Sequence, residues 1–373
     1  MRLLVKTLVL VAGTWIAAAA ALAQAPAPAG KAVDVYYSSS DADTTPAGNV
    51  QFHGPFSNET LTVRSDDIPT HDFLEITFDF LAIRTLDGSV PMRQNRPVAL
   101  GPDFFRLGLE SGPTLFYTTF SNMPLDPGFH DESKTQNYPS QVPGEHFPPQ
   151  TGSATKNTLG YAFPDLGPPQ RYPMDATYHI DFIVPDGSSH NAVQLTGMNL
   201  QPITDESWGV TDVQIRALQK ADVPQSDEAA IAKAFAASLD PASDDLPGNF
   251  KTLILGMDRT VKWIKDNVAP QAVDSDRIAQ LLKSMAADDD HVAERESAYT
   301  EMVSLGPLAE PYLRDRRITT VGDVRQRIDW ALQCISDTQI TDDAIRRVLL
   351  ATRVLEIIGT PDAMDLRLKL TRK

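Results

Sequence analysis

Alternation of apolar and polar residues is the main pattern in the first half of the chain. In the run 73–80, apolar side chains take the even positions, with Glu75, Thr77 and Asp79 between them. A two-residue period predicts a strand with one face in the core and the other, here that of Glu75 and Asp79, in solvent. Similar alternation recurs at 61–63, 105–109, 178–182, 193–195 and 213–215. Because no helical stretch separates these runs, we predict an antiparallel β-sandwich over 33–220.

After residue 219 the apolar residues follow the spacing of helices. Predicted helices cover 227–239, 250–268, 276–287, 292–305, 308–313, 321–335, 342–358 and 363–370, with Ser226 as the cap of the first. The joints 305–309 and 358–363 each place Gly where a helix ends and Pro where the next begins. This weak repeat predicts an all-α domain of HEAT-like hairpins over 221–373.

The first residues have the layout of a secretory signal. Arg2 and Lys6 supply positive charge, an apolar stretch follows at 8–22, and small residues flank a cleavage point after residue 23. We therefore predict a signal peptide at 1–23, a spacer at 24–32, and export to the periplasm, the cell surface or the medium. The alternative is a retained membrane anchor, but the apolar stretch is shorter than the ~20 residues that span a bilayer.

Composition narrows the choice of partners. The 373-residue chain has a formal net charge of −16, so nucleic acid and anionic lipid would be repelled, and cations or neutral polymers suit it better. The single cysteine, Cys334, excludes an intrachain disulfide and stands in an apolar run, where a buried position is expected. Arg314, Arg316 and Arg317 form a compact basic cluster that would either dock an acidic partner or face solvent at a helix end.

A calcium site is one hypothesis for the acidic residues at the ends of the predicted strands. Asp103, Asp205 and Asp212 supply the hard oxygen ligands that Ca²⁺ prefers, and Asp87 and Glu206 stand near them in sequence as further donors. The alternative is that these residues form polar turns and a solvent-facing position, which need no metal. The pattern slightly favours the alternative.

Aromatic residues offer a second hypothesis, a sugar-binding surface. Trp208 begins the last predicted strand, and Tyr138 and Tyr161 come from the long polar insertion 121–161, which is a candidate binding lip. Aromatic faces provide amphipathic area that can stack on a sugar ring. A Trp that enters a sandwich strand more often belongs to the core, and the pattern favours the core for Trp208.

Five motifs stand in the order found in a family of β-sandwich modules of exported bacterial proteins. They are Gly-Pro-Asp at 101–103, Thr-Thr-Phe-Ser-Asn at 118–122, Gln-Asn-Tyr-Pro at 136–139, Asn-Thr-Leu-Gly-Tyr at 157–161 and Asp-Glu-Ser-Trp-Gly at 205–209. The chain resembles this family, some members of which carry PEP-CTERM sorting tails, over about 48–217. The resemblance implies a lectin-like or jelly-roll sandwich and no settled activity. The stretches 276–282, 305–313 and 354–361 resemble HEAT-like segments, which implies protein contact.

These observations together predict a non-catalytic, exported binding protein. The sandwich would recognise a glycan or another envelope component, and the helical part would bind a protein partner. One alternative is a carbohydrate-active hydrolase, which needs two carboxylates about 5 to 9.5 Å apart. No Gly-x-Ser-x-Gly elbow, glycine-rich phosphate loop or His-Glu-x-x-His motif occurs in the sequence. The other alternative is a purely structural envelope protein.

Overall fold

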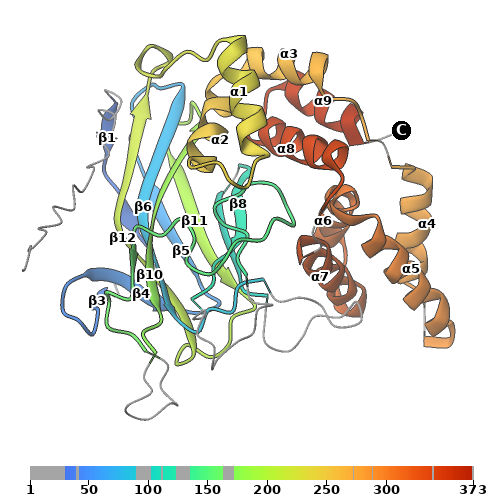
Figure 1. Cartoon of the computed structure of the whole chain (residues 1–373), viewed down its shortest axis with the longest axis horizontal. Helices are drawn as coiled ribbons and strands as arrows, with labels where there is room; N and C mark the ends of the chain where they lie inside the picture. Colours follow the sequence, from blue (N-terminus) through green and yellow to red (C-terminus); the bar gives the residue numbers. More distant parts are fainter. Residues whose placement is uncertain are drawn as a thin grey trace, which may run out of the picture.

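Two antiparallel sheets form the first part of the structure, a computed structural model (Figure 1). It describes residues 30–38, 42–89, 102–110, 112–122, 135–162, 172–271, 273–287, 289–337 and 340–371. The predicted signal peptide and most of the predicted spacer lie outside these ranges. The last two residues of the predicted spacer and Val33 form strand β1 beside the closing strand of the sheet.

The order of the strands confirms the predicted antiparallel sandwich. One sheet has the order β3-β4-β12-β6-β10-β9, with β1 also on β12, and the other has the order β2-β5-β11-β7-β8. The strands are β1 (Lys31–Val33), β2 (Tyr36–Tyr37), β3 (Ala42–Thr44), β4 (Gln51–Phe56), β5 (Thr60–Ser65), β6 (Phe73–Arg84), β7 (Phe104–Leu109), β8 (Thr114–Thr119), β9 (Thr155–Lys156), β10 (Asp175–Pro185), β11 (Asn191–Met198) and β12 (Glu206–Leu218).

Aromatic side chains join the two sheets in the core. Phe80 of β6 lies 4.2 Å from Phe105 of β7 between ring centroids, and Phe105 meets Trp208 of β12 edge-on at 4.9 Å. All three are buried, as the alternation of apolar positions predicts for Phe80 and Phe105 and as the sequence analysis favoured for Trp208. Such pairs stabilise the core by about 0.5–1.5 kcal/mol each beyond the area they bury.

The second part of the chain is helical, as predicted. Its α-helices are α1 (Glu228–Ser238), α2 (Leu246–Leu255), α3 (Asp258–Asn267), α4 (Ser275–Met285), α5 (Val292–Ser304), α6 (Glu310–Thr319), α7 (Gly322–Asp337), α8 (Asp343–Ile358) and α9 (Pro361–Thr371), with short 3₁₀ turns η1 (Lys220–Asp222), η2 (Asp289–His291) and η3 (Gly306–Leu308).

The ends of the helices correct two details of the sequence analysis. Asp227, not Ser226, caps α1 by accepting a hydrogen bond from the Ala230 amide, while the Ser226 hydroxyl donates to the Thr252 carbonyl. The predicted helix 250–268 is broken into α2 and α3, because Met257 adopts a positive φ of 45°. The joint at Gly359 is confirmed: this glycine ends α8 with a φ of 66°.

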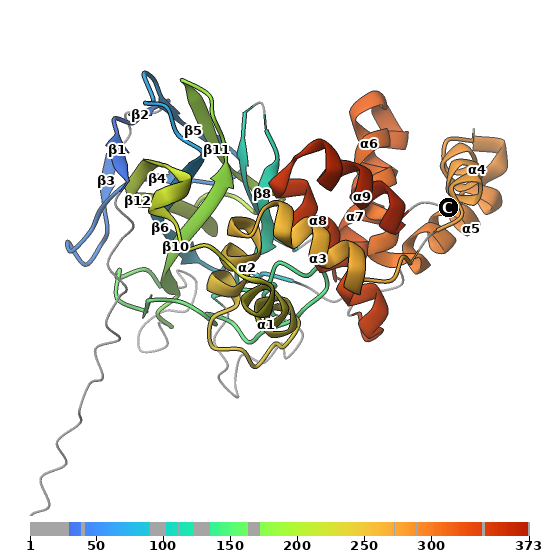
Figure 2. The same cartoon turned by 90° about the horizontal axis from the view of Figure 1, so that it is seen from above.

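The helices gather on one side of the sandwich, with α4 and α5 farthest from the strands (Figures 1 and 2). Phe250 of α2 lies 6.1 Å from Phe182 of β10, and one continuous hydrophobic cluster holds side chains of the sheets and of α1, α2, α3, α8 and α9. A second cluster unites α4–α7 and contains Cys334, which is buried as predicted. The sandwich and the nearer helices therefore share a core.

Helix α2 changes the environment of Glu75. The alternation predicts this side chain in solvent, but it is only 4% exposed. The Lys251 ammonium of α2 donates to Glu75 at 2.9 Å and to Asp181 of β10 at 2.7 Å. The prediction for Glu75 was therefore wrong, because a helix from much later in the chain covers this part of the sheet. Asp79, also predicted in solvent, is half-buried and bonds His179 at 2.8 Å.

Candidate functional site

Three of the acidic residues considered for calcium meet at one end of the sandwich. Asp103 stands just before β7, Glu206 begins β12, and Asp87 follows β6; they are 3%, 0% and 2% exposed. We call these three residues the acidic cluster. The strand register places Glu206 opposite Arg84, close to where the chain leaves β6 for Asp87.

Burial gives the acidic cluster unusual protonation behaviour. It raises the pKa of Asp103 well above its usual range, and the charges of Glu206 and Asp87 act in the same direction. Burial also raises the pKa of Glu206 to about 7, aided by Asp87 and opposed by two hydrogen bonds from Gln201. The cluster therefore holds a proton more firmly than isolated carboxyl groups would.

Two buried oxygen atoms near this end of the sandwich lack donors. Asp103 accepts hydrogen bonds from the amides of Asp87 and Gly88 through Oδ2, at 2.5 and 3.3 Å, but its Oδ1 has no partner among the described residues. The same holds for Oδ1 of Asn122, whose amide nitrogen donates to the Arg84 carbonyl. Within the described ranges, no group of three or more His, Cys, Asp or Glu side chains is arranged to hold a metal ion.

The structure places the other two calcium candidates, Asp205 and Asp212, in different surroundings. Asp205 adjoins Glu206 and accepts a hydrogen bond from the Thr85 hydroxyl at 2.5 Å. Asp212 is exposed, has a φ of 53°, and occupies a bulge in β12. At about 3.3 Å per residue, the strand carries it roughly 20 Å from Asp205. Asp103 is thus brought near Glu206 and Asp87 but not near Asp212.

The aromatic candidates are part of the protein interior. Trp208 has no exposed surface, and its indole nitrogen donates to the Ser57 carbonyl at 2.7 Å. Tyr138 is 7% exposed and meets Tyr178 edge-on at 5.3 Å, while Tyr161 is 8% exposed and lies under the Arg84 guanidinium. Trp208 therefore has no free face for a sugar, and the three rings do not form one surface.

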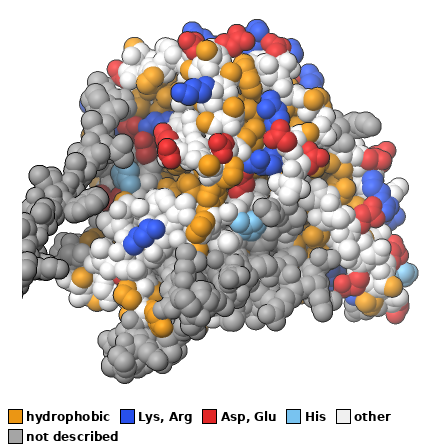
Figure 3. Space-filling view, viewed as in Figure 1, with side chains coloured by type: hydrophobic (Ala, Val, Ile, Leu, Met, Phe, Trp, Pro, Cys, Tyr) orange, Lys and Arg blue, Asp and Glu red, His pale blue; other side chains and the backbone are white. Residues whose placement is uncertain are grey.

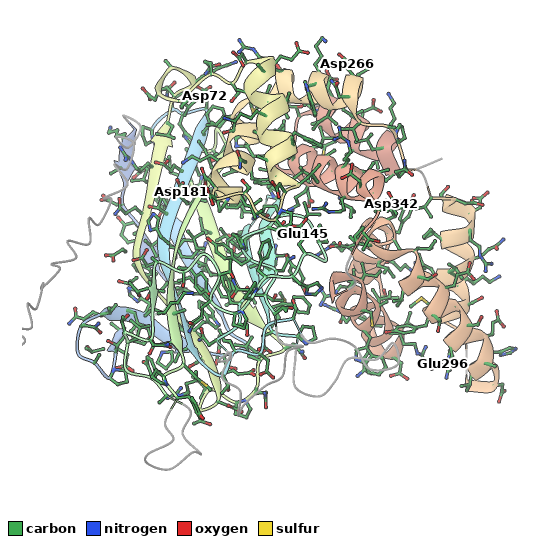
Figure 4. The ribbon with its side chains drawn as sticks, in the orientation of Figure 1. Asp72, Glu145, Asp181, Asp266, Glu296 and Asp342 are labelled. Carbon is green, nitrogen blue, oxygen red and sulfur yellow. The ribbon has the colours of Figure 1, made fainter. Side chains whose placement is uncertain are left out.

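The described part of the long insertion, 135–162, packs against the sandwich. The buried Gln136 side chain donates to the carbonyls of Tyr138 and Thr151, each at 2.8 Å, and accepts from the Tyr178 hydroxyl at 3.0 Å. Glu145, farther along, forms an ion pair with Arg346 of α8. Figure 4 shows Glu145 on the side of the sandwich that faces the helices. This segment therefore links the sandwich to the helical part.

A pocket that the sequence analysis missed lies where β7 and β8 meet the insertion and the helices. We call it the junction pocket; it encloses about 1000 Å³, part of it open to solvent. It is lined by Ser89, Phe104, Thr114, Tyr117, Thr118, Thr119, Asn137, Gln141 and Pro143 on the sandwich side, and by Pro307, Glu310, Arg314, Leu349, Thr352, Arg353, Glu356, Arg367 and Thr371 on the helical side. Its mixed polar and apolar wall is of the kind that lines ligand sites.

Charged side chains dominate the helical wall of the junction pocket. Arg314 of α6 pairs with Glu310 at 2.6 Å, and its guanidinium lies over the Tyr117 ring, 4.8 Å from the centroid. Arg353 of α8 pairs with Glu356 at 3.1 Å, and Arg367 of α9 approaches the same carboxylate at 3.9 Å. The wall thus carries three arginines and two glutamates.

The surroundings of the pocket add to this positive charge. Arg106 of β7 donates to the Thr114 hydroxyl at 3.0 Å. Its pKa is lowered by burial and then by the charges of Arg314 and Arg317. Elsewhere on the described surface in Figure 3, acidic and basic side chains are interspersed over the helices. The pocket wall and Arg106 together carry four arginines and two glutamates, a local excess of positive charge in a chain whose net charge is −16.

Sequence analysis detected only part of this site. It singled out Arg314, Arg316 and Arg317; of these, Arg314 lines the pocket, Arg316 is exposed, and Arg317 pairs with Asp329. The other two arginines of the wall come from α8 and α9, and their approach to Arg314 depends on how the helices fold back.

Comparisons with known proteins do not assign the chain to a family. No protein-family model matches it, and no curated protein does. The likeness to exported sandwich modules and to HEAT-like segments therefore stays a prediction. In the described ranges, no helix is long and apolar enough to cross a membrane.

Proposed function

We propose that this protein is a non-catalytic binding protein whose ligand, a glycan or another component of the cell envelope, occupies the junction pocket. The observation that carries the proposal is the pocket itself, of about 1000 Å³, with one wall from the sandwich and one from the helices. Export and a separate protein partner for the helical part stay predictions.

The chemistry of the wall supports binding. The Thr118 hydroxyl has no partner among the described residues and, with the half-buried Gln141 side chain, can bond sugar hydroxyl groups. Ser89 and Thr119 already bond each other, and the Asn137 side chain donates to the carbonyls of Val142 and Glu145. The two carboxylates of the wall are paired with arginines, an arrangement that suits fixed charges better than proton transfer. The described lining contains neither His nor Cys.

Blocking the pocket tests the proposal. Gln141 lines the pocket and is half-buried, so Gln141→Trp should fill part of the space. Gln194→Trp is the matched control, because Gln194 is also half-buried but lies on β11, outside the pocket. Binding would be measured by titration calorimetry with hexasaccharides, both neutral and uronic-acid-containing. Loss of binding in Gln141→Trp alone supports the proposal, whereas equal binding in both variants, or no binding to the wild type, contradicts it.

We also propose Ca²⁺ for the acidic cluster, favoured by the donor-free oxygens Oδ1 of Asp103 and Oδ1 of Asn122. Carboxylate and amide oxygens are ligands that Ca²⁺ binds in proteins. A complete site would also need backbone carbonyls or water. A bound ion would raise the free energy of unfolding by about 2.7 kcal/mol at a hundredfold excess over Kd. Thermal unfolding in EGTA and in millimolar Ca²⁺ tests this, with Asp103→Asn as the variant. An unchanged midpoint in the wild type would reject the ion.

A further inference from the structure

We infer that the junction pocket selects a carboxylate-bearing saccharide, such as an oligouronate, over its neutral counterpart. This inference rests on the proposed function and names the chemical class of its ligand. It follows from the charge of the pocket wall, from the carboxylates already bound there, and from how the arginines are held.

The charge of the wall favours an anion. Arg314, Arg353 and Arg367 outnumber Glu310 and Glu356 in the lining, and Arg106 stands behind them without an acidic partner among the described residues. An excess of positive charge in a cleft attracts an anion, since low-dielectric walls concentrate the field. The chain as a whole has a net charge of −16, so a local excess of arginine marks the pocket as a site for an anionic ligand rather than a neutral one.

The arginines have hydrogen-bonding capacity left for a ligand. Each guanidinium has five N–H donors, yet Arg353 and Arg367 share the single carboxylate of Glu356. Nη2 of Arg353 and Nε of Arg367 are buried and have no partner among the described residues. A second carboxylate would bond these donors after a small shift of either side chain, in the planar geometry that arginine and carboxylate share.

The protein's own carboxylates show which anion fits. The carboxylates of Glu310 and Glu356 already pair with the guanidinium groups of Arg314 and Arg353. A sugar carboxylate would therefore enter a site whose arginines are already arranged for carboxylates. The Thr118 hydroxyl and the Gln141 side chain of the opposite wall suit the remaining hydroxyl groups of a sugar.

Arg314 is held in place before any ligand arrives. Its guanidinium is fixed between the Glu310 carboxylate and the ring of Tyr117, and Tyr117 in turn stacks on Phe104 with centroids 4.7 Å apart. A cation held over an aromatic ring loses little further freedom on binding. This preorganisation supports selective recognition of an anion at this wall.

Calorimetry with two hexasaccharides tests the inference, one of uronic acid units and one of neutral hexoses. The wild type should bind the uronate at least about tenfold more tightly, because its carboxylates would accept charge-assisted hydrogen bonds from the arginines. Arg367→Gln should weaken uronate binding by about tenfold and leave neutral binding little changed. Arg64→Gln, which removes an exposed arginine on β5, is the matched control and should bind as the wild type does.

A third variant separates charge from misfolding. Glu356→Gln keeps the shape of the side chain but removes the carboxylate that competes for Arg353 and Arg367, so uronate binding should tighten several-fold. Weaker or equal uronate binding in this variant overturns the inference. So does wild-type binding of both saccharides with equal affinity, which leaves the proposed function intact. Binding of neither saccharide contradicts the proposed function itself.

Discussion

Replacing Glu206 by glutamine should stabilise the protein at pH 8 and change its stability little at pH 5. Burial raises the pKa of Glu206 in the folded state to about 7, from an ordinary value of 4.5. Between these values the folded chain holds a proton that the unfolded chain has released. The free energy of unfolding therefore falls as the pH rises through this window, and it stays lower above pH 7.

The size of the effect follows from the same shift. A rise from 4.5 to about 7 corresponds to about 3 kcal/mol of stability lost across the window. Part of this loss has already occurred at pH 5, because that pH lies above 4.5, and replacing Glu206 also removes one of the charges that raise the pKa of Asp103. We therefore expect Glu206→Gln to gain about 2 kcal/mol more over the wild type at pH 8 than at pH 5.

Urea unfolding at the two pH values, followed by circular dichroism, measures this difference. EGTA in all buffers keeps calcium out of the comparison. Asp212→Asn is the control, because it removes one exposed negative charge from the same strand. If Glu206→Gln shifts the unfolding midpoint equally at pH 5 and pH 8, with unchanged slopes, the reasoning about a buried, protonated cluster is refuted.

Three further predictions test the packing. Lys251→Met should cost about 2–3 kcal/mol in urea unfolding, because Glu75 is left buried without its ammonium, and adding Glu75→Gln should recover part of the loss; strictly additive effects would contradict this. Gly197→Ala should cost about 1–3 kcal/mol in thermal unfolding, since the new Cβ would lie 2.2 Å from the Ser57 carbonyl oxygen; an unchanged midpoint would contradict that contact. A chain of residues 30–222 alone should bind a hydrophobic dye and unfold at lower urea than the whole protein, and equal stability would argue against a shared core.

The alternation of apolar residues was enough to predict the sandwich but not the surroundings of each strand. Phe78 and Phe80 are buried between the sheets, as their two-residue period predicts. Glu75 follows the same period and should face solvent, yet it is buried because Lys251 arrives with α2. A strand pattern reports which face a side chain takes, and only the tertiary fold decides what covers that face.

The two candidate sites differ in how far the sequence could predict them. Asp103 and Glu206 were recognised because acidic residues stood at the ends of predicted strands, but whether they meet depends on strand order and register. Asp212 has the same local character and lies elsewhere. The arginines of the junction pocket come from α6, α8 and α9, and Tyr117 from β8, so no local pattern could unite them.

The position of the junction pocket couples its occupancy to the docking of the helices on the sandwich. The two parts already meet through charged groups at Lys251 and Asp181, and at Arg346 and Glu145. A ligand that contacts both walls binds only the docked arrangement, so it must stabilise docking by RT ln(1+[L]/Kd), which is about 2.7 kcal/mol at a hundredfold excess. Weakening the ion pair between Arg346 and Glu145 should conversely weaken ligand binding, because linkage is reciprocal. We therefore expect ligand affinity and the stability of the docked arrangement to change together.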